Sequence, residues 1–304
     1  MFMHKRLTRV FETAKVIPYD DSSKFICFSD CHRGDNFWAD DFAPNQNLFH
    51  HALNYYYKNG FTYIELGDGD ELWENKSLED IVIAYQHIFS LLKDFYERNR
   101  LYLIWGNHDN DRGQPKYFKR KSASFGSISD PKIISLFQEI EALEGLILQH
   151  SVTGQKIFLV HGHQGDFWND DVWRLSRLMV RYVWRKLQIF GINDPTSPAK
   201  NFRKGIQIEN KIIDWAAKQQ QVIIVGHTHR PSFPITSDDP PYYNDGCCIH
   251  PRSITGIEIE HNAIQLIKWC TRPNAEGLLQ VTRELIAGPR SLDIYLKRSK
   301  NENH

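Results

Sequence analysis

Five short apolar runs in this sequence each end in a polar motif built from Asp, Asn or His. The runs are KFICFS, FTYIEL, LYLIW, KIFLV and VIIV, and the motifs that follow them are DCH, GD, GNHD, HGH and GHTH. Apolar runs of this length, separated by helix-like stretches, are typical of buried strands in a parallel α/β sheet. Such sheets bind ligands beyond the carboxyl ends of their strands. The five motifs are therefore expected to meet in one place, which constrains the fold more than any other feature.

The polar side chains that follow these runs share one kind of chemistry. Each offers a carboxylate, amide or imidazole group, and none offers a thiolate. The candidate metal ligands are Asp30, His32, Asp68, Asn107, His161, His227 and His229. Oxygen and imidazole donors suit Mn²⁺, Fe or Zn²⁺. Seven donors are too many for one catalytic ion with open positions, but they suit two ions about 3.5–4 Å apart that share a carboxylate. Water held between two such ions readily becomes a nucleophile.

Each motif alone is a weak signal. A single DxH or HxH is more often a polar loop than a metal site, and GNHD is also typical of a turn. The motifs gain weight from their order and spacing, because 38 residues separate Asp30 from Asp68 and 39 separate Asp68 from Asn107. Glycines at positions 67, 106, 162 and 226 also allow tight loops that bring ligands together. Together the motifs favour a metal site over a set of unrelated loops.

Read in order, the motifs SDCHRGD, GDGDELWE, GNHD, HGH and GHTHR resemble those of the calcineurin-like metallophosphoesterases. The resemblance covers residues 24–269. It implies a four-layer α/β/β/α sandwich with a helical, lid-like insertion and a centre for two divalent metal ions, with Mn²⁺ preferred and Fe or Zn²⁺ as alternatives. It also implies a phosphoric ester hydrolase in which metal-bound hydroxide attacks a phosphodiester or pyrophosphate.

The same resemblance assigns roles to individual residues. It places Asp30, His32 and His229 on one ion, and Asn107, His161 and His227 on the other, with Asp68 bridging the pair. The catalytic candidates are His108, which would assist the leaving group, and Glu71, which would orient His108. Asp70 and Asp109 compete with Glu71 for that role.

The substrate has several readings. The segments GDGDELW, HGHQGD and GHTHRP are most similar to the UDP-2,3-diacylglucosamine hydrolase branch of the family, which implies a lipid-linked nucleotide substrate. That branch typically carries Arg in place of His108, whereas GNHD is the form of the broader family. A broad phosphodiesterase and a protein or nucleotide phosphatase are therefore alternatives. A non-catalytic binding scaffold on the same fold is a third reading.

The chain is expected to form one metallophosphoesterase domain over 24–271, with an N-terminal extension (1–23), a peripheral C-terminal tail (272–304) and a helical insertion over about 164–220. Strands are expected over 24–29, 61–66, 101–105, 145–150, 156–160 and 222–225, with further short strands within 241–249, 255–260 and 263–269. Helices are expected over 46–58, 78–98, 170–190 and 206–219. Cys31 alternates with two candidate ligands and should point into the core.

The insertion carries the candidate substrate-binding residues. On a helix, Arg174, Arg177, Arg181 and Arg185 fall within roughly an 80° arc, and Trp, Tyr, Leu and Val fill most of the remaining surface. One reading is a buried helix whose arginines pair with carboxylates. The other is a lid whose guanidinium groups bind a diphosphate or lipid headgroups. His163 is either a contact to substrate or ligands beside His161 or an ordinary loop histidine.

Composition limits the partners and the compartment. The 37 Lys and Arg residues balance the 37 Asp and Glu residues, so no nucleic acid partner is expected. The partner expected is a phosphorylated small molecule or a lipid-linked nucleotide. Five cysteines without CxxC spacing favour a reducing compartment, and no apolar run reaches 18 residues. These features indicate a cytoplasmic protein, with peripheral membrane contact through the insertion as a further expectation.

Overall fold

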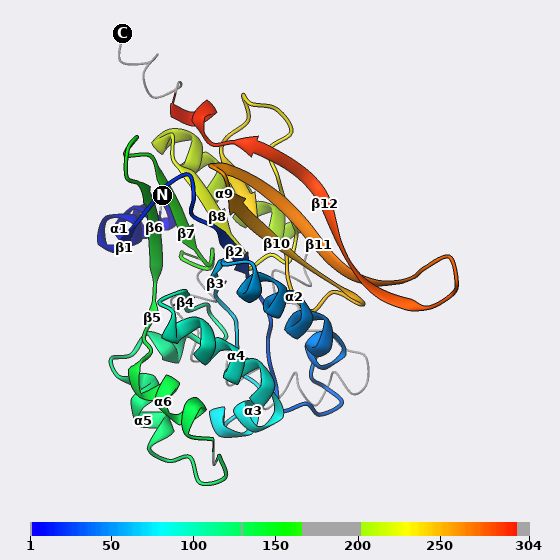
Figure 1. Ribbon diagram of the computed structural model, residues 1–304. Helices are drawn as coiled ribbons and strands as arrows, with labels where there is room; N and C mark the ends of the chain where they lie inside the picture. Colours follow the sequence, from blue (N-terminus) through cyan, green and yellow to red (C-terminus); the bar gives the residue numbers. More distant parts are fainter. Residues whose placement is uncertain (1, 129, 166–201, 297–304) are drawn as a thin grey trace.

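A computed structural model describes residues 2–128, 130–165 and 202–296. Two β-sheets pack face to face, and helices cover the outer face of each sheet (Figure 1). The order of layers is helix, sheet, sheet, helix. This arrangement confirms the α/β sandwich expected from the sequence.

The larger sheet has seven strands and the smaller has five. The larger sheet has the order β12 (Leu279–Ser291), β11 (Ala263–Pro273), β10 (Ser253–Glu260), β2 (Phe25–Phe28), β3 (Thr62–Leu66), β4 (Leu101–Ile104), β5 (Ala142–Leu143). The smaller sheet has the order β1 (Lys15–Tyr19), β6 (Gly145–His150), β7 (Lys156–Val160), β8 (Val222–Val225), β9 (Tyr242–Asn244). Strands β2 to β5 are parallel, as are β7, β8 and β9, so their carboxyl ends point the same way within each sheet.

Three hydrophobic cores hold the layers together. The first lies between the seven-stranded sheet and helices α2 (Gln46–Lys58), α3 (Leu78–Ala84), α4 (Gln86–Glu97), α5 (Tyr117–Ser122) and α6 (Pro131–Glu139). The second lies between the sheets, and the third lies under α1 (Phe2–Thr13) and α9 (Phe202–Gln219). Short 3₁₀ helices occupy Ala43–Asn45 and Asn110–Gly113.

Strand β2 shows how the sequence supplies two of these cores at once. Ile26 and Phe28 pack into the first core, whereas Phe25 and Cys27 pack into the core between the sheets. Side chains alternate between the two faces of a strand, so a strand covered on both sides must be apolar at every position. Cys31 lies in the first core and is fully buried, as expected from its alternation with the candidate ligands.

Several elements differ from the sequence-based expectations. The helix expected over 78–98 is two helices, α3 and α4, which meet at Tyr85. The hydroxyl of Tyr85 hydrogen-bonds to the buried carboxylate of Asp40, a tertiary contact that periodicity does not reveal. Helix α5 lies at Tyr117–Ser122, where no helix was expected.

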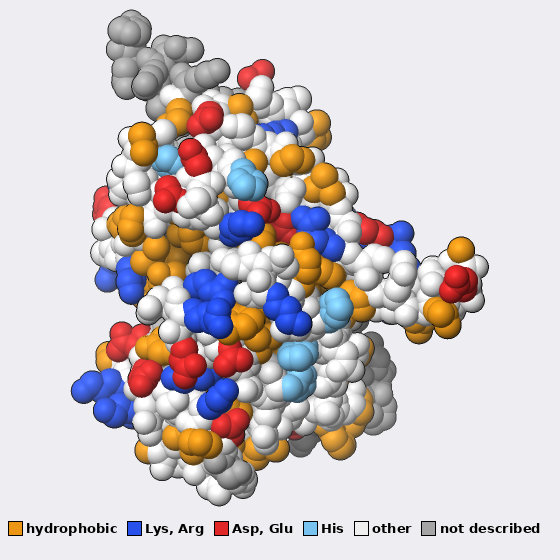
Figure 2. Space-filling model, in the orientation of Figure 1, with side chains coloured by type: hydrophobic (Ala, Val, Ile, Leu, Met, Phe, Trp, Pro, Cys, Tyr) orange, Lys and Arg blue, Asp and Glu red, His pale blue; other side chains and the backbone are white. Residues whose placement is uncertain are grey.

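Both ends of the chain join the sheets. Strand β1 comes from the segment expected as an N-terminal extension and pairs with β6. Strand β12 comes from the segment expected as a peripheral tail and pairs with β11. The β11–β12 hairpin projects from the body, with Leu278 and Leu279 exposed near its tip (Figures 1 and 2).

Part of the expected insertion lies outside the described residues, including the helix expected over 170–190 with Arg174, Arg177 and Arg181. Of the insertion, the structure describes residues 164–165 and 202–220, which include α9. No helix within the described ranges is both long and apolar enough to span a membrane.

Candidate metal centre

The seven candidate ligands converge at the carboxyl ends of five strands. Four of them follow β2, β3 and β4 of the larger sheet, and three follow β7 and β8 of the smaller sheet. Five of the seven have left-handed backbone conformations, with φ between 47° and 67°. Those five are Asp30, His32, Asp68, His227 and His229. For residues other than glycine this conformation costs on the order of 1 kcal/mol each, and such strain concentrates at functional sites.

One cluster of ligand atoms comes from Asp30, His32 and His229. Asp30 Oδ1 lies 3.0 Å from His229 Nε2 and 3.7 Å from His32 Nε2. The other carboxylate oxygen, Asp30 Oδ2, accepts the backbone N–H of His227 at 2.9 Å. One oxygen therefore anchors the carboxylate to the neighbouring loop while the other faces the two imidazole nitrogens.

A second cluster comes from Asp68, His161 and His227. Asn107 is buried and stands between Gly106 and His108, whose backbones approach Asp68 Oδ1. His161 Nε2 lies 3.1 Å from Asp68 Oδ2, and its Nδ1 lies 2.9 Å from the carbonyl oxygen of Leu66. That contact to a carbonyl places a proton on Nδ1, so Nε2 is the nitrogen that would bind an ion.

Asp68 lies between the two clusters. Its Oδ2 is 3.1 Å from His161 Nε2 and 3.8 Å from His32 Nε2, and these nitrogens belong to different clusters. Its Oδ1 accepts the backbone N–H of His108 at 2.8 Å. This is the position that a carboxylate shared by two ions requires.

Two further atoms test whether the site fits metal ions. Asn107 Oδ1 and His227 Nε2 are buried, and neither has a hydrogen-bond partner among the described residues. Buried polar atoms are nearly always paired, because an unpaired one loses its water without replacement. A divalent ion would satisfy both atoms, and the donor set of carboxylate, amide and imidazole suits Mn²⁺, Fe or Zn²⁺. The residues therefore fit the two ions.

Glycines make the close approach of these loops possible. A Cβ added at Gly106 would lie 2.1 Å from Asp68 Oδ1, and one added at Gly226 would lie 2.6 Å from Asp30 Oδ2. At Gly67, which has a φ of +95°, a Cβ would lie 2.4 Å from His161 Nδ1. Any other residue at these positions would push a candidate ligand away.

The electrostatics of the centre favour bound cations. Burial would raise the pKa of Asp68, but the neighbouring imidazoles of His161 and His108 hold it well below its ordinary value. Burial would lower the pKa of His161, but Asp68 and Asp30 raise it to about 9. Burial, reinforced by His161, lowers the pKa of His227. The two carboxylates thus stay ionised and attract positive charge.

Glu71 joins a candidate ligand to the candidate acid. Its Oε2 lies 2.8 Å from His32 Nδ1, and its Oε1 lies 2.9 Å from His108 Nδ1. Asp70 instead pairs with Arg33, and Asp109 accepts the backbone N–H groups of two loop glycines. Of the three acids proposed from the sequence, the structure places Glu71 beside His108.

His163 is 1% exposed and lies next to two candidate ligands and Trp105. Its ring centroid is 5.5 Å from that of His161, 6.3 Å from that of His227 and 5.3 Å from that of Trp105. The structure thus brings His163 next to the candidate ligands and buries it there.

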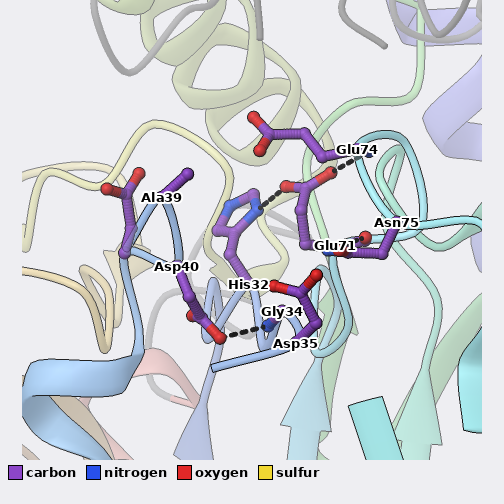
Figure 3. A pocket seen from close by; sticks show the side chains of 9 residues that line it. His32, Gly34, Asp35, Ala39, Asp40, Glu71, Glu74 and Asn75 are labelled. Atoms are coloured by element: carbon purple, nitrogen blue, oxygen red, sulfur yellow. Dashed lines mark hydrogen bonds and ion pairs between the residues drawn. The ribbon is translucent and has the colours of Figure 1, made fainter. Parts of the chain in front are cut away.

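A small pocket opens beside His32 and Glu71. Figure 3 shows carboxylates projecting around it and the hydrogen bond that joins His32 to Glu71. Its other lining residues are Gly34, Asp35, Ala39, Asp40, Asp41, Glu74 and Asn75. The acidic wall makes this side of the centre unfavourable for a second anionic group of a substrate.

Sequence reasoning missed residues that hold the ligand loops. The Nδ2 of Asn244 donates to the carbonyl of Gly226 at 2.8 Å and to Thr228 Oγ1 at 3.1 Å. Ser29 Oγ lies 2.6 Å from Asp245 Oδ1 and also contacts Asp30 Oδ2. Asn244 ends the short strand β9 and Asp245 follows it, so the signal was again a polar pair at a strand end.

Comparison with known proteins identifies the family. Residues 23–231 match the model of the family described as "Calcineurin-like phosphoesterase", and this range contains all seven candidate ligands and His108. The chain belongs to the calcineurin-like phosphoesterase family. Its ligand clusters accord with the divalent metal ions that such phosphoesterases typically bind. The family match does not extend to the UDP-2,3-diacylglucosamine hydrolase branch.

No individual curated protein matches the chain in sequence. Similar solved structures include Vps29 from Chaetomium thermophilum and the same protein complexed with the RaPID-derived cyclic peptide RT-D3. Each is 10% identical to this chain, covers 87% of it and has a TM-score of 0.39. The matches cover 97% and 96% of the two Vps29 chains. Similarity at this level carries no functional argument.

Proposed function

We propose that this calcineurin-like phosphoesterase hydrolyses a phosphodiester or pyrophosphate with two divalent metal ions. The observation that carries the proposal is the meeting of two ligand clusters at Asp68, together with buried Asn107 Oδ1 and His227 Nε2, which lack hydrogen-bond partners among the described residues. When bound, the ions would supply Lewis acidity that activates water and neutralises the phosphoryl oxygens.

The chain itself would supply the site for each ion. Asp30, His32 and His229 would hold one ion, and Asn107, His161 and His227 the other. Asp68 would contact both, because its Oδ2 faces imidazole nitrogens of both clusters. Mn²⁺ is the first candidate, with Fe and Zn²⁺ compatible with the same donors.

His108 would assist departure of the leaving group. The contact between its Nδ1 and Glu71 keeps a proton on Nδ1 and leaves Nε2 as the atom available to a substrate. The side chain of His108 is 21% exposed, whereas that of Glu71 is 10% exposed. A protonated Nε2 would hydrogen-bond to the leaving oxygen and donate its proton as the P–O bond breaks.

The substrate class is a narrower proposal. A nucleotide-diphosphate lipid of the kind cleaved by UDP-2,3-diacylglucosamine hydrolases is supported by the segments GDGDELW, HGHQGD and GHTHRP. A broader phosphodiesterase is supported by His108 in the GNHD motif and by the acidic wall beside His32 and Glu71, which opposes a second phosphate there. We favour the broader class.

Activity assays on the metal-loaded full chain test this proposal. Protein loaded with Mn²⁺, Fe or Zn²⁺ should hydrolyse diesters or pyrophosphates faster than monoesters. His108→Asn should lower kcat by about 10²–10⁴-fold where chemistry limits the rate and should leave the metal content at two ions. His261→Asn is the matched control, since His261 is an exposed histidine with a φ of 53° that Asn adopts readily. A chain loaded with two ions that hydrolyses none of these esters would contradict the proposal.

The arginines of the insertion provide a second test. On the narrower substrate class, Arg174, Arg177 and Arg181 would bind the diphosphate or lipid headgroup. Alanine at these three positions should then raise KM for a nucleotide-diphosphate lipid and spare a small chromogenic phosphodiester. An equal loss on both substrates would assign the arginines a structural role.

A further inference from the structure

The ring of His108 is held on three sides. Its Nδ1 contacts the carboxylate of Glu71, and the ring of His32 meets it edge-on with centroids 4.6 Å apart. The indole of Trp73 stacks on it at 4.3 Å, with an angle of 22° between the planes. A single hydrogen bond at Nδ1 would still allow the ring to tilt through small changes in χ1 and χ2. A parallel stack removes this freedom.

Trp73 and Glu71 belong to one stiff turn. The backbone N–H groups of Trp73 and Glu74 donate to Glu71 Oε1 at 3.1 and 3.2 Å. The Nδ2 of Asn75 donates to the carbonyl oxygen of Glu71 at 2.9 Å. The carboxylate that fixes one edge of His108 and the indole that fixes its plane are thus set by the same few residues.

Trp73 is buried beside His108. The side chain is buried, with the residue 3% exposed, yet Trp73 belongs to none of the three hydrophobic cores formed by the described residues. Its neighbour Leu72 packs into the first core instead. An indole stacked on an imidazole beside the metal centre can fix the orientation of that imidazole.

We infer that Trp73 is a positioning residue, which acts with Glu71 to aim Nε2 of His108 at the leaving oxygen. The inference rests on the proposed role of His108 and adds a residue that the family match does not assign. Misplacing a reacting group by about 1 Å can cost about 10²-fold in rate. The loss should fall on substrates whose leaving oxygen needs a proton.

The test compares two phosphodiesters that differ only in their leaving group. For an alkyl leaving group, Trp73→Leu should lower kcat by about 10–100-fold, because the departing alkoxide needs the proton. For a p-nitrophenyl leaving group, which departs without a proton, the loss should stay below about threefold. Trp73→Phe, which keeps a stacking ring, should restore most of the alkyl activity. Trp38→Leu is the control, since Trp38 is 62% exposed and its ring lies against that of Phe37.

Two outcomes of this assay would overturn the inference. One is an equal loss on both esters at unchanged metal content. The other is a further loss when Trp73→Leu is added to His108→Asn, because a residue that acts through His108 has nothing left to position.

Histidine-selective NMR of the Zn²⁺-loaded full chain separates this inference from the proposed function. In the unaltered protein the His108 ring protons, assigned by their loss in His108→Asn, should show the upfield shift of a stacked ring. They should lose this shift and broaden in Trp73→Leu. Unchanged signals would overturn the inference even in an active enzyme. Changed signals in a chain that hydrolyses no ester would uphold the positioning and reject the proposed function.

Discussion

A buried ion network next to the candidate ligands gives a sharp stability prediction. Glu65 lies at its centre and accepts from Arg33 at 2.7 and 3.0 Å and from Arg112 at 2.9 Å. Arg33 and Arg112 also pair with Asp70, and Arg112 pairs with Asp109. Each of these five side chains is at most 1% exposed. Glu65→Gln removes the central charge with little change in shape.

The magnitude follows from the pKa of Glu65. Burial would raise this pKa, but Arg33 and Arg112 lower it from 4.5 to about 2. At about 1.4 kcal/mol for each tenfold change in the acid dissociation constant, the paired carboxylate contributes about 3 kcal/mol to the free energy of unfolding. Because the folded pKa is the lower one, this stability is present above about pH 4.5 and is lost as the pH falls towards 2.

Denaturant unfolding of both proteins between pH 7 and pH 3 measures this contribution. Glu65→Gln should be less stable than the unaltered protein by about 3 kcal/mol at pH 7, and the difference should shrink below pH 4.5. Burial raises the pKa of Asp109 to about 6, so the effect of Asp109 on stability changes with pH in the opposite direction. Because Asp109 is present in both proteins, this effect largely cancels in the difference between their free energies of unfolding. Glu97→Gln, which loses a 3.8 Å pair at an exposed carboxylate, should cost less than about 1 kcal/mol. A difference independent of pH, or below about 1 kcal/mol at pH 7, would refute the reasoning.

Three further predictions concern the metal centre. In a metal titration, Gly106→Ala should abolish binding of at least one ion, because the added Cβ would lie 2.1 Å from Asp68 Oδ1. The control Gly126→Ala should bind metal normally, because its added Cβ would have no atom within 4 Å. Asp245→Ala should lower the affinity for one ion by about 10–100-fold in the same titration, since Asp245 and Asp30 both contact the hydroxyl of Ser29. An unchanged affinity would argue against this support of Asp30. Chelation should lower the thermal midpoint of unfolding, because the ions bind only the folded clusters; an unchanged midpoint in a protein shown to have carried metal would contradict this.

The position of the centre could be predicted from the sequence because it depends on local signals. Each apolar run became a buried strand, and the polar residues after it met at the end of the sheet. The helix expected over 46–58 is α2, with the same bounds, because its apolar residues follow a helical period.

Other features depend on contacts between distant residues and leave no local signal. The break at Tyr85 reflects its hydrogen bond to Asp40, 45 residues earlier. The pairing of β12 with β11 makes a strand of a segment whose residues are mostly exposed. The stack of Trp73 on His108 joins two loops that no spacing rule connects.

The metal content of the purified chain tests the central claim most directly. Elemental analysis after reconstitution should find two divalent ions per chain in the unaltered protein and in His108→Asn. Asp68→Ala, which removes the carboxylate between both clusters, should retain fewer than one. A folded chain that binds no metal under any condition, or an Asp68→Ala variant that still binds two ions, would contradict the account.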